Sequence, residues 1–118
     1  MKYLCLIYDE EKKWNAMSKS EQDAGLAAYF AFSDSIKKSG HYLGAEALQP
    51  VHTATIVRVR NGKLSTTDGP FAETKEQLGG FYLINAKDLN DAIQVASGIP
   101  SARWGSIEVR PIQEFDQQ

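Results

Sequence analysis

The chain has 118 residues and a mass of 13.1 kDa, the size of one globular domain, so we expect a single domain over residues 1–118. Hydrophobic residues make up 42% and charged residues 24%, a composition that supports a folded core and excludes a disordered chain. Thirteen Lys and Arg against fifteen Asp and Glu give a net charge of -2, and the single Cys5 excludes an internal disulfide and a multi-cysteine zinc site.

The first half of the chain predicts a strand, a helix and a second strand. Residues 2–8 are apolar at both odd and even positions, which is typical of a strand covered on both faces. Ser18 and Glu21 form the Ser-x-x-Glu pattern of a capping box, so a helix should run from there to about Ser39 and end at Gly40. Its inward stripe is expected to contain Leu26, Tyr29, Phe30, Ser33 and Ile36, widened by Phe32. Residues 42–48 form the second strand.

A β-hairpin is the clearest local feature of the middle of the chain. Residues 53–60 alternate in polarity, Asn61-Gly62 suits a two-residue type I′ turn, and residues 63–67 return as the partner strand. After the break at residues 68–70, residues 71–77 are expected to form one short helical turn, because Pro is tolerated at a first helical position.

The last third of the chain predicts a strand, a helix and a final strand. Residues 79–86 are again apolar on both parities, and Asp88 caps a helix that ends near Gly98. The inward face of that helix is expected to hold Leu89, Ala92, Ile93 and Ala96. Residues 105–112 form the last strand. Two strand-helix-strand units predict an α+β fold, a ferredoxin-like split βαβ sandwich with an inserted β-hairpin.

The strand pattern also bears on assembly. Two helices cover one face of the predicted sheet, yet residues 2–8 and 79–86 present large apolar groups on both faces. Leaving four such side chains exposed costs about 6 to 12 kcal/mol, comparable with the whole stability of a domain. We therefore expect a homodimer packed sheet to sheet. The alternative is a monomer whose hairpin or C-terminal tail folds over its own sheet.

Three stretches of the sequence resemble the DGPF subgroup of the YCII-related family. They are DGPFAETKEQLGGFYLI at residues 68–84, KYLCLIY at residues 2–8 and GSIEVRP at residues 105–111. The resemblance runs over nearly the whole chain and implies the dimeric α/β barrel form of the ferredoxin-like fold. It also implies a small bacterial cytoplasmic protein of unassigned function, with a gene often beside that of an extracytoplasmic-function sigma factor. Enzyme-like relatives use a His on the first helix, whereas this chain has none between Ser18 and Ser39.

The segment after the hairpin concentrates ionisable side chains. If it rims a cleft, Asp68 or Glu73 acts as a general base and Lys75 holds an anionic group of the ligand. Phe71 is expected to anchor the loop in the core and to contribute to ligand binding. The structural alternative treats Asp68-Gly69-Pro70 as a turn and the charged residues as solvated.

Four further residues are candidates for the site. His41, at the end of the first helix, either interacts with free helix carbonyls or contributes to ligand binding, and His52 is the second imidazole. Glu46 and Glu108 lie within strand patterns, and a carboxylate that points into a barrel interior must be paired or used by a ligand. Glu46 is therefore a third candidate catalytic carboxylate and Glu108 a candidate ligand-binding group. Cross-strand pairing with an Arg is the alternative for both.

These features favour a cytoplasmic homodimer that binds a small, partly apolar molecule between helices and sheet, with residues 68–76 at the mouth of the pocket. The first alternative is an enzyme that performs proton transfer or lyase chemistry without a cofactor, through Asp68, Glu73 or Glu46. The second is a regulatory partner linked to an extracytoplasmic-function sigma factor.

Several partners are not expected. The charge balance lacks the basic excess that binds phosphate backbones, so nucleic acid is an unsuitable partner. No apolar run approaches the roughly 20 residues that cross a bilayer, and the start of the chain is too short and soon too acidic for a signal peptide. Gly79-Gly80 lacks the spacing of a phosphate-binding loop, and we expect neither a cofactor nor a metal.

Overall fold

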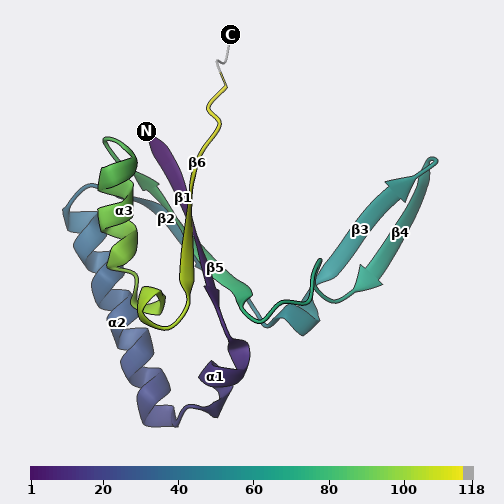
Figure 1. The fold of residues 1–118 in the computed structure, drawn as a ribbon, viewed down its shortest axis with the longest axis horizontal. Coiled ribbons are helices and arrows are strands. Elements are labelled where there is room, and N and C mark those ends of the chain that lie inside the picture. The colour runs from purple at the N-terminus through teal and green to yellow at the C-terminus, as the bar shows by residue number, and fades with distance from the viewer. Residues whose placement is uncertain (116–118) are drawn as a thin grey trace.

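The computed structural model describes residues 1–115, with an antiparallel four-stranded sheet, a two-stranded sheet and three α-helices (Figure 1). In chain order the elements are β1 (Lys2–Asp9), α1 (Glu11–Ala16), α2 (Lys19–Lys38), β2 (Tyr42–Ala47), the 3-10 helix η1 (Val51–Thr53), β3 (Thr55–Arg60), β4 (Lys63–Asp68), β5 (Gln77–Asn85), α3 (Leu89–Ser97), the 3-10 helix η2 (Pro100–Arg103) and β6 (Ser106–Pro111). The larger sheet has the order β2-β5-β1-β6, so the structure is α+β and compatible with a ferredoxin-like fold.

Helix α2 begins and ends as its sequence predicts. The Ser18 hydroxyl accepts from the backbone N–H of Glu21 at 3.1 Å, and the Glu21 carboxylate accepts from the backbone N–H of Ser18 at 2.9 Å. Gly40 has φ +82°, the left-handed conformation that ends a helix and that favours glycine. The capping box is therefore confirmed.

The core lies between one face of the four-stranded sheet and helices α2 and α3. It contains Tyr3, Cys5 and Ile7 of β1 together with Tyr82 and Ile84 of β5, which alternate with half-buried neighbours along each strand. Burial raises the pKa of the Cys5 thiol to about 11, so this cysteine behaves as a small apolar side chain.

The inward face of α2 differs from the expected stripe. Phe30 is 73% exposed and Leu26 is also exposed, whereas Phe32 packs with its ring edge on Tyr82, at 5.1 Å between centroids. Tyr29, Ser33 and Ile36 face the core as expected, and Ser33 hydrogen-bonds the Tyr82 hydroxyl at 2.7 Å. The prediction that Leu26 and Phe30 lie inward is thus wrong, because a polar contact to the sheet and an aromatic pair set the rotation.

Three other details differ from expectation. Helix α1, which places the Trp14 ring 3.0 Å from where a Cβ of Gly25 would lie, has no counterpart among the predicted elements. On α3, Ala92 and Ala96 are buried as expected. Leu89 and Ile93 are exposed, however, and Val95 packs against the core instead. The segment 71–77 forms no helical turn, because β5 already begins at Gln77.

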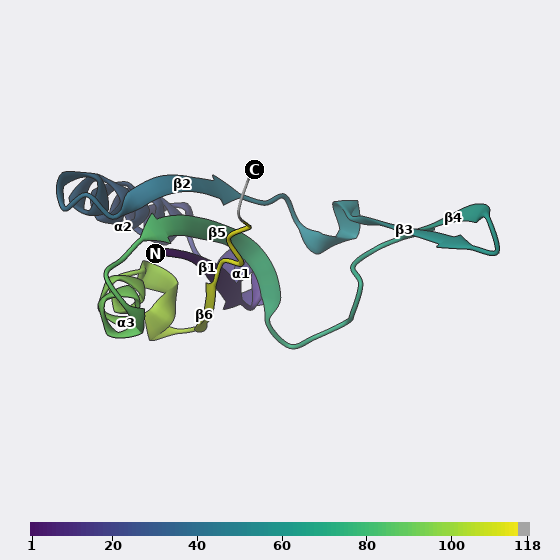
Figure 2. The same ribbon diagram turned by 90° about the horizontal axis from the view of Figure 1, so that it is seen from above.

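Strands β3 and β4 form the arm, residues 55–68, which projects from the rest of the molecule, here called the body. Asn61 and Gly62 have φ angles of 52° and 73°, the backbone that a type I′ turn requires, and β3 pairs antiparallel with β4 on either side of them. The arm extends on the side of the sheet opposite to α2 and α3 (Figures 1 and 2). The radius of gyration is 16.5 Å, against about 13.5 Å for a compact chain of this length.

The face of the four-stranded sheet away from the helices is here called the open face. It carries the residues that alternate with the core residues along each strand. It holds the half-buried apolar residues Leu4, Leu6, Tyr8, Phe81 and Leu83. Within residues 1–115 neither the arm nor the chain after β6 folds back over this face (Figure 2). In the same part of the chain, no helix is long and apolar enough to span a membrane.

Candidate functional site

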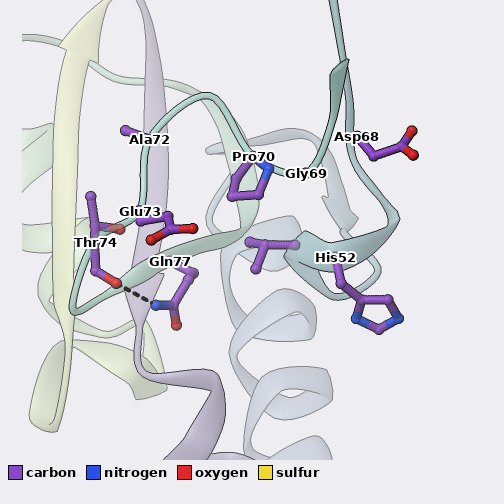
Figure 3. Close-up of a pocket in the computed structure, with 9 residues that line it drawn as sticks. His52, Asp68, Gly69, Pro70, Ala72, Glu73, Thr74 and Gln77 are labelled. Atoms are coloured by element: carbon purple, nitrogen blue, oxygen red, sulfur yellow. Dashed lines mark hydrogen bonds between the residues drawn. The ribbon is translucent and has the colours of Figure 1, made fainter. Parts of the chain in front are cut away.

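A cavity of about 440 Å³ opens where the arm joins the body (Figure 3). Its walls come from η1, the end of β4, the 69–76 loop and the start of β5, and consist of Val51, His52, Asp68, Gly69, Pro70, Ala72, Glu73, Thr74 and Gln77. The expected place, between helices and sheet, is instead filled by packed side chains such as Phe32, Ile36 and Tyr82. The pocket therefore lies at the root of the arm.

Helix α1 supports two walls of this cavity. The Gln77 side chain donates to the carbonyl of Thr74 at 2.6 Å and accepts from the backbone N–H of Glu11 at 3.0 Å. The Glu11 carboxylate in turn accepts from the backbone N–H of Val51 at 2.9 Å. Because Val51 begins η1 and Gln77 begins β5, Glu11 joins two segments of the cavity wall that are far apart in sequence.

Two of the predicted site residues, Asp68 and Glu73, line the cavity. Both side chains are exposed, and within residues 1–115 neither carboxylate has a hydrogen bond or an ion pair. Figure 3 shows Glu73 beside Pro70 and Gln77, while Asp68 and His52 point away from it. The carboxylates are thus free to contact a ligand, but they do not form an acid-base pair with the imidazole.

The other residues predicted on the loop lie outside the cavity. Phe71 is 81% exposed, so the prediction that it anchors the loop in the core is wrong. The loop lies against α1 and the root of the arm rather than over the core, and hydrogen bonds of Gln77 hold it. Lys75 is exposed and its ammonium lies 3.8 Å from the Glu10 carboxylate. Glu76 accepts from the Ser106 hydroxyl at 2.9 Å.

Glu46 and Glu108 share one row of the open face. Glu46 of β2 is opposite Phe81, Phe81 is opposite Leu6, and Leu6 is opposite Glu108 of β6. Glu108 is bonded to Arg110 of the same strand rather than to a cross-strand Arg. Glu46 is exposed and has no ionic partner within the described residues. The two carboxylates therefore flank an apolar centre, away from the cavity.

His41 lies at the opposite end of β2 from the cavity. Its Nε2 is 3.1 Å from an Asp91 carboxylate oxygen, and its Nδ1 is 2.7 Å from the Ser39 hydroxyl. The hydrogen bond from the backbone N–H of Lys87 lowers the pKa of Asp91, and the hydrogen bond to His41 lowers it further. The ring thus bonds a carboxylate on α3 and a hydroxyl, not the free helix carbonyls that we expected. These contacts join the end of α2 to α3.

A second polar chain crosses the body. The Tyr29 hydroxyl is bonded to buried Ser101, whose hydroxyl donates to the Asp9 carboxylate at 3.1 Å. Burial raises the pKa of Tyr29, which keeps its hydroxyl protonated at neutral pH. A shallow groove of about 790 Å³ lies nearby, between α2 and the segment from Gly98 to Trp104, and it contains none of the predicted site residues. Within residues 1–115 no cluster of His, Cys, Asp or Glu is arranged to hold a metal ion.

Sequence comparison places these features in a family. Residues 1–116 match the YCII-related domain. An uncharacterised protein of Rhizobium meliloti (strain 1021) is 37% identical over 114 residues, which cover 95% of this chain and 92% of that protein. Since both similarities extend over nearly the whole length, the chain belongs to the YCII-related family.

Proposed function

We propose that this protein is a cytoplasmic homodimer of the DGPF subgroup that binds a small, partly apolar molecule in the cavity at the root of the arm. The observation that carries the proposal is the cavity itself, which combines an apolar wall with uncommitted carboxylates. Its volume of about 440 Å³ lies within the range of small-molecule sites, about 300 to 1,000 Å³.

The lining of the cavity indicates the chemistry of the ligand. Val51, Pro70 and Ala72 offer apolar contact, while Glu73 and Asp68 are hydrogen-bond acceptors that carry negative charge. Such a site favours an apolar skeleton that bears an amine, a hydroxyl or another donor group. A strongly anionic ligand would be repelled by the two carboxylates.

The open face supports the dimer. A single copy leaves Leu4, Leu6, Phe81 and Leu83 only half-buried, although these side chains lie at the centre of the sheet. Packing two such faces together removes this apolar surface from water in a closed, two-fold assembly.

The enzymatic alternative has less support. Proton transfer by Asp68, Glu73 or Glu46 calls for a carboxylate protected from solvent and placed near a cation or an imidazole. All three side chains are exposed and, within the described residues, none has such a partner. Binding is therefore the function that this geometry supports best.

The regulatory alternative, a partner linked to an extracytoplasmic-function sigma factor, has one structural feature in its favour. Leu26 and Phe30 are exposed, lie one turn apart on α2, and are separate from the open face of the sheet. Replacing both by Ser should then abolish binding to the regulatory partner without changing the dimer.

Native mass spectrometry of the protein purified from its host tests the ligand proposal. We expect a small molecule to be retained by the wild type and lost from Glu73→Gln, because that exchange removes the charge at the cavity wall. Glu114→Gln, an exposed carboxylate beyond β6, is the matched control and should retain the molecule. Equal retention by the wild type and Glu73→Gln, or no bound molecule in any sample, would contradict the proposal.

A further inference from the structure

We propose that the arm of each copy docks through its apolar face on the body of a second copy, so that every cavity is enclosed by two chains. This inference goes beyond sheet-to-sheet packing because it assigns a partner surface to residues 55–68. Its statement about the cavity rests on the proposed function.

The register of the arm gives it two different faces. Val59 is opposite Leu64, and Val57 is opposite Thr66, so one face is apolar towards the tip of the arm, with Thr55 and Asp68 at its root. Arg58 is opposite Ser65, and Arg60 is opposite Lys63, so the other face is cationic towards the tip, with Ile56 and Thr67 at its root. A hairpin with one apolar and one charged face is suited to pack with its apolar face against another protein surface.

In a single copy, the described residues 1–115 leave the apolar face uncovered. Val57, Val59 and Leu64 are 62%, 58% and 70% exposed. An isolated two-stranded hairpin is marginally stable in water, and it needs packing against another element to hold its shape. As far as the structure describes it, the body of the same chain does not provide that packing, because the arm leads away from the body (Figures 1 and 2).

A second copy of this chain supplies the missing surface. The arm projects on the side of the sheet where the open face lies, so a copy packed on that face sits alongside the arm (Figure 2). Two-fold symmetry then repeats the contact, with each arm along the other body. The exposed Phe71, next to the root of the arm, extends the apolar surface towards the second copy.

Charge selects contact between arm and body over contact between two arms. The arm, residues 55–68, contains Arg58, Arg60 and Lys63 and one acidic residue, Asp68 at its root, so it carries +2; since the chain carries -2, the remaining residues carry -4. Bringing two arms together would place six cations side by side. An arm that lies on the body of another copy through its apolar face keeps Arg58, Arg60 and Lys63 on its outer face, and the longer-range attraction between these cations and the net negative body favours association.

The position of the cavity links this docking to ligand binding. Both segments that join the arm to the body, η1 with His52 and the 69–76 loop with Glu73, line the cavity. An arm held against a second copy therefore fixes the cavity walls and brings that copy over the opening. A free arm leaves the walls without this support.

The triple variant Val57→Thr, Val59→Thr and Leu64→Thr tests the docking, because Thr keeps the β-propensity of the arm and removes its apolar character. We expect the dimer dissociation constant, measured by sedimentation, to rise at least about tenfold. Loss of the co-purifying molecule should follow the loss of dimer. Thr67→Val, the reverse exchange on the opposite face, is the matched control and should leave the dissociation constant unchanged.

A second variant guards against misfolding of the arm. Arg58→Glu with Arg60→Glu keeps the apolar face and should also weaken the dimer, with far-UV circular dichroism showing an intact body. A triple variant that dimerises like the wild type would contradict the docking of the arm. In that case the Glu73→Gln result alone tests the ligand proposal. A wild type that is monomeric at every concentration overturns both the arm contact and the proposed dimer.

Discussion

The body and the arm of this protein are stabilised in different ways. The body has a core in which residues such as Ile84 and Ile99 are fully buried between sheet and helices. The arm has a well-formed ladder from Thr55 to Asp68, but none of its residues is buried. One chain thus contains a region that packing holds in place and another whose shape depends on its turn and its hydrogen bonds.

The comparison shows which interactions a single copy can provide. Local chemistry selects the turn of the arm, because Asn61 and Gly62 adopt the positive φ angles that it requires. Local chemistry does not place the arm, since no described side chain of the body packs across its apolar face. We therefore regard the arm as the part of the chain that a second copy completes.

The largest expected effect is a contrast between matched apolar truncations. Ile84→Ala removes a fully buried side chain and should destabilise the protein by about 2 to 5 kcal/mol at every protein concentration. Val59→Ala should change the stability of dilute protein by less than about 0.5 kcal/mol and weaken the dimer instead. Urea unfolding at two protein concentrations measures both effects. Equal losses in dilute protein would show that the arm already packs within one copy.

An intermediate effect is expected at the turn of the arm. Gly62→Ala places a Cβ at φ +73° and should cost about 1 to 2 kcal/mol, confined to the arm. Hydrogen exchange should therefore quicken across β3 and β4 and remain unchanged in β1 and β5. Gly44→Ala is the control, because that glycine has no positive φ and no atom near its missing Cβ. Faster exchange throughout the body would mean that the two regions unfold together.

The smallest effect concerns the pH dependence of the body. The pKa of Asp91 in the folded protein is below its ordinary value of 3.8, so the unfolded chain binds that proton more readily. Asp91 therefore stabilises the fold above pH 3.8, and this contribution is lost as the pH falls through the folded pKa. Asp91→Asn should lower the melting temperature at neutral pH and reduce its fall in acid.

Two results check this pH effect. Asp34→Asn, which breaks only an exposed pair with Lys38, is the control and should change the melting temperature less. A melting curve for Asp91→Asn that keeps the full acid dependence of the wild type would contradict the role given to Asp91. Dimerisation through the arm should be unaffected by either variant.

The sequence predicted features that depend on neighbours in the chain. The capping box of Ser18 and Glu21, the cap at Asp88 and the hairpin turn each involve residues within four positions of one another. The rotation of α2 was not predictable in this way. It depends on Phe32 fitting against Gly98, where a Cβ would lie 2.9 Å from the ring, and these residues are far apart in sequence.

The candidate site was predictable only in part for the same reason. Asp68 and Glu73 were predicted as site residues because they lie in a cluster of ionisable side chains, and both line the cavity. No local pattern shows that His52 joins them, or that Glu11 connects the wall at Val51 to the wall at Gln77. Asp91, the partner of His41, is likewise on a distant helix.

The mass of the wild-type protein in solution tests the central claim most directly. Sedimentation equilibrium across a range of concentrations should give twice the chain mass of 13.1 kDa, because we propose that a second copy covers both the open face and the arm. Dissociation should become more pronounced as the salt concentration rises, since salt screens the attraction that we propose between the positively charged arm and the net negative body of the other copy. A mass of one chain at all concentrations would contradict the account.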